Sequence, residues 1–197
     1  MIRAGITGNI GSGKSFVCNI FKNNGIPVFY SDEETKLLYL VPKIRDIIIE
    51  HFGEETYFEN GSLNKKIMSY LLFKNKDALK FIEDLLYPAL NQRFDEWCNA
   101  QNAKLVLFES AILFEKHYDS FFDTVIFVSA NEQTRIKRVM KRDNCSEDQV
   151  RTRMALQQDE TLKIMKSDYV IYNNEDIDIT GKVKEIIRNI ITDFHLQ

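Results

Sequence analysis

The chain has 197 residues, of which 44% are hydrophobic and 28% are charged, a mixture typical of one medium-sized globular domain that can bury a core. Its formal net charge of −3 argues against a nucleic-acid-binding protein that depends on bulk basicity, and no apolar run is long enough to cross a membrane. The three cysteines are scattered and lack disulfide or zinc-ligand spacing, which suits a reducing compartment, so we expect a cytoplasmic protein. From the charge and the lack of a long apolar run we expect no nucleic-acid or membrane partner.

The first forty residues of the chain begin with a short apolar stretch, residues 2–7, which predicts a buried strand. Gly8 to Ser15 reads GNIGSGKS and fits the pattern G-x-x-x-x-G-K-S/T. Apolar residues at helical spacing follow, and the predicted helix ends near residues 23–25. Strand, loop and helix in this order form the context in which the pattern binds phosphate.

The physical chemistry of this loop is specific. Its glycines allow unusual backbone angles and let main-chain N–H groups approach an anion, while the helix that begins near Lys14 adds its positive end. Lys14 can then reach the β- and γ-phosphates, and the Ser15 hydroxyl can bind Mg²⁺. The alternative, a glycine-rich turn with a surface lysine, does not account for the agreement of spacing, order and context. The sequence therefore predicts a nucleoside-triphosphate site.

A second strand is predicted at residues 26–30, and Ser31 with Glu34 forms a capping-box pattern for the next helix. Asp32 thus lies where a strand ends and a helix begins, at the edge where open parallel sheets bind ligands. Either it takes part in chemistry there or it only complements the helix dipole.

From about residue 36 to residue 100 the pattern is helical, with a stop at Gly53 and a predicted kink or boundary at Pro88. This block reads as an insertion on the sheet, and such insertions hold the phosphate acceptor in kinases with this loop.

The second half of the chain carries three further predicted strands, at residues 104–109, 123–129 and 168–172, a short helix at 112–115 and a closing helix at 179–191. Glu109 ends the first of these strands. It is either a second Mg²⁺-organising carboxylate or simply an acid at a strand end.

Residues 131–143 hold the densest positive charge, and Arg135, Arg138 and Arg142 share a predicted helical face. Ser146 caps a second helix, so the two helices form a basic hairpin. Either this hairpin closes over a triphosphate and supplies an arginine to the transition state, or it is a solvated charged face.

Several stretches in order resemble the dephospho-coenzyme A kinase family. They are Gly5 to Ser15, residues 28–36 around Asp32, Leu86-Tyr87-Pro88, residues 111–115, Lys141-Arg142-Asp143, residues 154–158 and residues 167–174. The resemblance implies an α/β phosphate-loop kinase fold with three layers, a parallel sheet, a helical insertion and a helical lid. It implies one domain, with a core at 1–32, 103–130 and 167–197, an acceptor-binding insertion at about 33–102 and a lid at about 131–166.

That family transfers the γ-phosphoryl group of ATP to the ribose 3′-hydroxyl of dephospho-coenzyme A, with Mg²⁺ as cofactor and ATP as co-substrate. The resemblance implies catalytic roles for Asp32, Lys14 and Arg142. The implied ATP-binding residues are Gly8, Gly11, Ser12, Gly13, Lys14, Ser15, Phe16, Arg138, Arg142 and Asn174. The implied substrate-binding residues are Asp32, Lys36, Lys65, Tyr87, Pro88, Arg93 and Glu115. For the metal it implies Ser15, with Asp32 and Glu109 as further candidates.

The chain departs from the family pattern at some positions, among them Tyr30, Phe16, Tyr87 and Ala111. Another small-molecule or nucleoside-monophosphate kinase would share the loop and the lid but differ in the insertion. A GTP-binding switch would need an Asn-Lys-x-Asp reader, and neither Asn-Lys pair of the chain fits it. We expect a monomer or a weak homo-oligomer.

Overall fold

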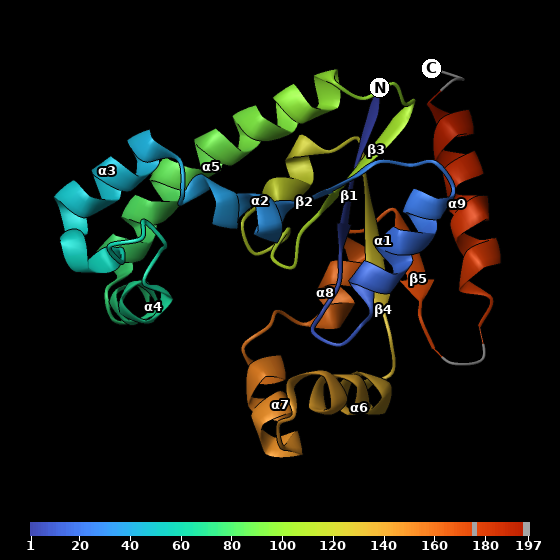
Figure 1. Cartoon of the computed structure of the whole chain (residues 1–197). Helices are drawn as coiled ribbons and strands as arrows, with labels where there is room; N and C mark the ends of the chain where they lie inside the picture. Colours follow the sequence, from blue (N-terminus) through green and yellow to red (C-terminus); the bar gives the residue numbers. More distant parts are fainter. Residues whose placement is uncertain (175–176, 195–197) are drawn as a thin grey trace. The chain divides into compact units, whose positions relative to one another are not determined.

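The computed structural model describes residues 1–174 and 177–194. A five-stranded sheet with the strand order β2-β3-β1-β4-β5 organises the chain, and each pair of neighbouring strands is parallel (Figure 1). The strands are β1 (Ile2–Thr7), β2 (Val28–Tyr30), β3 (Leu105–Glu109), β4 (Thr124–Ser129) and β5 (Tyr169–Tyr172).

All strands of a parallel sheet end at the same edge, and the register shows which residues meet there. Glu109 at the end of β3 lies between Ile6 of β1 and Tyr30 of β2, and Ser129 of β4 lies beside Tyr172 of β5. The phosphate loop leaves β1 at this edge. The edge is therefore the place to look for a ligand site.

The contacts divide the chain into two compact units, one formed by residues 1–30 and 101–197 and the other by residues 31–100. The first unit holds the sheet with α1 (Lys14–Asn23), η2 (Tyr118–Phe121), α6 (Glu132–Asp143), α7 (Glu147–Ala155), α8 (Glu160–Met165) and α9 (Ile179–Asp193). The second unit holds α2 (Ser31–Leu38), α3 (Pro42–Phe52), η1 (Glu54–Thr56), α4 (Lys65–Lys74) and α5 (Lys76–Asn99). Of the predicted core segment 167–197, residues 175–176 and 195–197 lie outside the described part.

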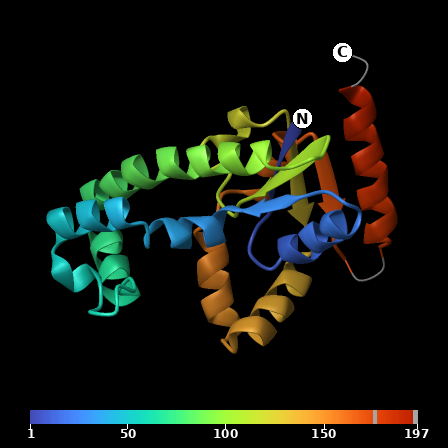
Figure 2. The same ribbon diagram turned by 45° about the horizontal axis from the view of Figure 1, so that its top comes forward.

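The core of the first unit follows from the alternation of side chains along β1. Ala4 and Ile6 are fully buried in a cluster with apolar residues of α1 and α9, which lie side by side in both views (Figures 1 and 2). Gly5 faces the other way, where a Cβ atom would lie 2.6 Å from Leu113 and 2.9 Å from Phe122. Helices therefore cover one face, and the segment after β3 packs on the other, which confirms the predicted three-layer α/β fold.

The second unit is helical throughout its longer elements, as the periodicity predicts. The Asn75 side chain caps α5 by accepting hydrogen bonds from Asp77 N at 2.9 Å and Ala78 N at 3.2 Å. α5 buries a stripe with spacings of four residues: Ala78, Ile82, Leu86, Leu90, Phe94 and Cys98. Pro88 lies inside this 24-residue helix, on its exposed side, so of the predicted kink or boundary at Pro88 the boundary is wrong.

Two further predicted elements differ in the structure. Residues 112–115 form turns rather than a helix, with hydrogen bonds from Lys116 N to Ile112 O and from His117 N to Phe114 O, and the 3₁₀ helix η2 follows. Leu113 and Phe114 are nearly fully buried, so tertiary packing sets the path of this segment. The predicted second strand is also shorter, because regular pairing begins only after Pro27, at Val28.

No helix among residues 1–174 and 177–194 is long and apolar enough to cross a membrane.

Candidate active site

The phosphate loop has the backbone geometry that its glycines predict. Gly11 and Gly13 adopt left-handed conformations, with φ angles of 79° and 87°. Helix α1 begins directly afterwards at Lys14. The loop thus turns tightly from β1 into the positive end of a helix, which is the arrangement that binds phosphate groups through main-chain N–H groups.

Lys14 lies against this loop. Its ammonium nitrogen donates to the Gly8 carbonyl at 3.2 Å and lies 3.7 Å from Glu109 Oε1, and both side chains are mostly buried. Glu109 therefore has a structural partner in the lysine that is predicted to hold phosphate. Behind them, burial and then the charge of Glu109 raise the pKa of Cys18 to about 12, so its thiol is not a nucleophile at neutral pH.

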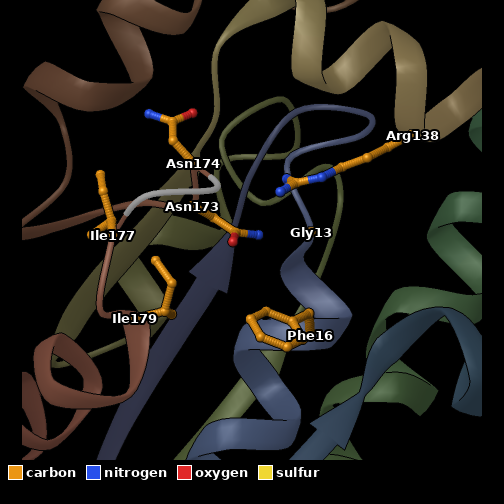
Figure 3. A pocket seen from close by; sticks show the side chains of 7 residues that line it. All are labelled: Gly13, Phe16, Arg138, Asn173, Asn174, Ile177 and Ile179. Atoms are coloured by element: carbon orange, nitrogen blue, oxygen red, sulfur yellow. The ribbon is translucent and has the colours of Figure 1, made fainter.

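A pocket of about 440 Å³ opens beside the loop (Figure 3). Its lining residues come from the end of the loop, α1, α6, the segment after β5 and the start of α9: Gly13, Phe16, Arg138, Asn173, Asn174, Ile177 and Ile179. The Phe16 ring and the two isoleucines supply apolar surface, and Arg138 and the asparagines supply hydrogen-bonding groups. A flat, apolar ligand with polar edges, such as a nucleobase, suits this lining.

The pocket side of the loop is held by residues distant in sequence. The Ser12 carbonyl accepts a hydrogen bond from Asn173 Nδ2 at 2.8 Å and lies 3.4 Å from Arg138 Nη1. Asn174 instead accepts a hydrogen bond from Asn131 N at 2.9 Å, which ties the end of β5 to the start of α6. Of the two asparagines, sequence reasoning singled out only Asn174; Asn173 is the one that contacts the loop.

The three arginines predicted to share a face of α6 have different surroundings. Arg135 is 8% exposed and pairs with Glu160 at 3.2 Å, so it belongs to the interior. Arg138 reaches the loop and the pocket. Arg142 is exposed and donates to Asp143 at 2.7 Å and 3.1 Å, and this hydrogen bonding holds the pKa of Asp143 below its usual range.

The predicted hairpin of α6 and α7 forms with its capping box. Ser146 accepts from Gln149 N, and the Gln149 side chain accepts from Ser146 N. Arg153 of α7 joins Arg142 on Asp143, at 2.7 Å. The hairpin therefore carries two arginines held by one carboxylate at its tip.

Mg²⁺ prefers oxygen ligands and usually keeps phosphate oxygens and water beside one or two protein groups. Ser15 is exposed on the first turn of α1, where its hydroxyl can serve as one such ligand. Within the described ranges, no three His, Cys, Asp or Glu side chains cluster as a ready-made metal site. The residues present thus fit a metal held jointly with a bound nucleotide.

Glu115, a predicted substrate-binding residue, lies in the turn segment after β3 and binds the ammonium group of Lys163 at 2.5 Å. Sequence reasoning missed Lys163, because a lone lysine between apolar residues gives no signal of burial.

The remaining predicted substrate residues lie in the second unit. Asp32 and Lys36 are exposed and stand four residues apart on α2, so they share one helical face. Lys65 is exposed at the start of α4, and Tyr87 and Pro88 lie on α5. Arg93 of α5 pairs with Glu34 of α2 and ties these two helices together.

A family model described as dephospho-CoA kinase matches residues 2–178 of the chain. The dephospho-CoA kinase of Porphyromonas gingivalis is 35% identical over 194 residues, which cover 98% of this chain and 96% of the relative. The dephospho-CoA kinase of Bacteroides fragilis is 31% identical over 196 residues, covering 98% and 95%. Among solved structures, TT1252 from Thermus thermophilus is similar, with a TM-score of 0.83 and 26% identity, covering 98% of this chain and 97% of that one.

Proposed function

The chain belongs to the dephospho-CoA kinase family, and from this membership we propose that it transfers the γ-phosphoryl group of ATP to the ribose 3′-hydroxyl of dephospho-coenzyme A. The products are coenzyme A and ADP. One observation carries the proposal: the family match runs from residue 2 to residue 178 and so includes the helical unit as well as the phosphate loop. A kinase for another acceptor is expected to share the loop and to differ in the helical unit.

The first unit is the nucleotide side of the reaction. The main-chain N–H groups of the loop and the ammonium group of Lys14 bind the phosphates, and the positive end of α1 favours their charge. The adenine enters the pocket beside Gly13, where Phe16 and Arg138 offer faces for stacking and the asparagines offer polar edges.

Ser15, together with phosphate oxygens of the nucleotide, would hold Mg²⁺, which would supply positive charge to neutralise the β- and γ-phosphates. Asp32 and Glu109 would be the further carboxylates for the metal, Glu109 besides its contact with Lys14.

The second unit is the acceptor side. Asp32 accepts the proton of the ribose hydroxyl, and Lys36, Lys65 and Arg93 bind anionic groups of the acceptor, with Tyr87 and Pro88 lining its site. Arg142 exchanges its contact with Asp143 for the transferring phosphoryl group and stabilises charge in the transition state. We place the protein in the cytoplasm, as a monomer or a weak homo-oligomer.

The direct test measures ADP release from Mg·ATP with and without dephospho-coenzyme A, and identifies coenzyme A by mass spectrometry. AMP and adenosine serve as comparison acceptors, since they carry the ribose without the pantetheine arm. We expect turnover that depends on dephospho-coenzyme A. Faster turnover of a comparison acceptor, or none with dephospho-coenzyme A while ATP still binds, would refute the proposal and leave the fold assignment intact.

The base is tested by Asp32→Asn, which keeps the shape of the side chain and removes the proton acceptor. We expect kcat to fall by about a hundredfold or more, as for loss of a general base, while the Kd for Mg·ADP stays nearly the same. Glu33→Gln is the matched control, because Glu33 is the neighbouring exposed acid on the same helical turn. Near-normal turnover of Asp32→Asn would remove Asp32 from this role.

A further inference from the structure

Lys163 of α8 is a fully buried lysine outside the predicted nucleotide and acceptor residues. Its ammonium group donates to two partners, Asn9 Oδ1 at 2.9 Å and Glu115 Oε1 at 2.5 Å. Asn9 is the second residue of the phosphate loop, and Glu115 lies on the segment after β3. One buried cation therefore joins the loop to a predicted acceptor-binding carboxylate.

The segment that carries Lys163 also contacts the phosphate loop at a second residue, Ile10. The amide of Ile10 donates to the side chain of Gln157 at 2.9 Å, so two consecutive loop residues are held by the stretch that follows the α6–α7 hairpin. This stretch is itself fixed, because Glu160 accepts a hydrogen bond from Ser129 at the end of β4 and pairs with Arg135. The anchoring makes Lys163 a rigid support for Asn9.

Energetics argue that this lysine is not there for stability alone. Removing a charge from water costs several kcal/mol, and a buried ion pair often does no better than apolar side chains of the same volume. The Lys163 side chain is fully buried, so an apolar side chain of similar volume could fill the same position. What an apolar residue could not do is to orient the Asn9 amide and the Glu115 carboxylate at the same time.

The hydrogen bonding of the two Glu115 carboxylate oxygens indicates the purpose for which Lys163 orients this side chain. While Oε1 accepts from Lys163, Oε2 is buried and has no hydrogen-bond partner within the described residues, although the side chain as a whole is 21% exposed. Buried carboxylate oxygens are nearly always hydrogen-bonded, so Oε2 has an unused acceptor position. It is closed to solvent as it stands, so a donor outside the chain completes it when the carboxylate turns toward the exposed part of the side chain. The ribose and amide groups of the acceptor substrate carry such donors.

We propose that Lys163 is a positioning residue that serves both substrates: it fixes the phosphate loop through Asn9 and orients Glu115 toward the phosphoryl acceptor. The acceptor half of this inference rests on the proposed function, and the loop half does not. Lys163 touches neither substrate and acts only through its two partners.

The test compares the KM values for ATP and dephospho-coenzyme A in variants of each arm. Asn9→Ala removes the loop arm and Glu115→Gln removes the charge of the acceptor arm. We expect Asn9→Ala to raise the KM for ATP and Glu115→Gln to raise that for dephospho-coenzyme A, each by about tenfold, because this is the scale on which one hydrogen bond affects affinity. Lys163→Met should raise both. Lys166→Met is the matched control, as it removes an exposed lysine three residues further along, and it should change neither value.

Double variants separate positioning from a general structural role. If Lys163 acts through Glu115, adding Lys163→Met to Glu115→Gln leaves the KM for dephospho-coenzyme A unchanged and raises only the KM for ATP. This double variant removes both members of the buried ion pair, so it is expected to fold even where Lys163→Met alone does not. A further rise in the KM for dephospho-coenzyme A, multiplying the two single effects, would overturn the acceptor half.

If the proposed function is wrong, the same variants give a different pattern of results. If the wild-type protein does not use dephospho-coenzyme A, the proposed role of Lys163 in orienting Glu115 toward the acceptor is refuted as well. The proposed role of Lys163 in fixing the phosphate loop is then tested by the Kd for Mg·ADP. Asn9→Ala and Lys163→Met should then weaken Mg·ADP binding to the same extent, and together no further. Independent effects on this Kd would overturn the loop half as well.

Discussion

Gly13 has two constraints at once, a left-handed backbone and a close neighbour. Its φ angle is 87°, and a Cβ atom would lie 2.2 Å from Asn173 Nδ2, the group that donates to the Ser12 carbonyl. Gly25, after the end of α1, has a similar φ angle of 80° but nothing within 4 Å of its Cβ position. Substitutions at Gly13 and Gly25 therefore separate the effect of backbone strain from the effect of steric contact.

We expect Gly25→Ala and Gly13→Ala each to lose about 1 kcal/mol of unfolding free energy from the left-handed conformation. Only Gly13→Ala should also lose Mg·ADP binding, because the new methyl group displaces Asn173 and enters the phosphate cradle. Urea unfolding and calorimetric titration measure the two quantities. Equal Mg·ADP affinity in the two variants would show that the close contact at Gly13 does not matter for binding.

Residue patterns predicted the phosphate cradle well, and the reason is that the cradle is local. Eight consecutive residues, from Gly8 directly after β1 to Ser15 in the first turn of α1, determine its shape. The pocket beside it was not predictable in the same way, because it needs Asn173, Asn174, Ile177 and Ile179 to lie next to Gly13 and Phe16. Only the folded sheet brings these two segments together.

At the scale of elements, the capping box at Ser146 was predictable and one short helix was not. The other predicted capping box does not form, because Ser31 is already part of α2 and Glu34 pairs with Arg93. α8 has six residues, and its exposed and buried positions are inverted: Leu162 and Met165 are mostly exposed, while Lys163 is fully buried. A hydrophobic pattern cannot reveal such a helix, because its apolar residues do not mark the buried face. For the same reason, the contacts of Lys163 could not be predicted from the sequence.

The packing of α1 on the sheet makes a prediction about pH. Burial raises the pKa of Cys18 from 9.0 to about 12 in the folded protein. The protonated thiol is therefore favoured by folding, and its contribution to stability is complete below about pH 9 and is lost as pH rises toward 12. Between these limits the unfolded chain binds fewer protons than the folded one, so the unfolding free energy falls.

We expect the unfolding free energy of the wild type to fall more steeply above pH 9 than that of Cys18→Ala, by at most about 1.4 kcal/mol per pH unit. Tyr39 and Tyr57, whose pKa values burial also raises to about 12, contribute equally to both proteins. Urea unfolding at half-unit steps from pH 8 to 10.5 gives the slopes, with Cys145→Ala, at a less buried cysteine, as control. Parallel curves for wild type and Cys18→Ala would contradict the prediction.

For the whole molecule, the division into two units suggests that each substrate has its own part of the chain. The loop, the pocket and Lys163 belong to the unit of residues 1–30 and 101–197, and five of the predicted acceptor-binding residues besides Asp32 lie in residues 31–100: Lys36, Lys65, Tyr87, Pro88 and Arg93. Glu115 is the exception, since it lies in the first unit and is predicted to bind the acceptor. Hydrogen exchange can follow both units in one experiment, because ligand contacts raise the free energy of local opening.

With Mg·ADP alone, we expect slower amide exchange in the loop, in α6 and around residues 173–174, and no change in α2, α4 or α5. Dephospho-coenzyme A alone should instead slow exchange in α2 and α5 and in the turn segment that holds Glu115. Gly13→Ala serves as the control, because it should lose the Mg·ADP pattern and keep the acceptor pattern. If Mg·ADP protected residues 31–100 as strongly as the loop, the assignment of one substrate to each unit would be wrong. The helical unit would then respond to the nucleotide directly, and the acceptor roles of its charged residues would have to be assigned again from the beginning.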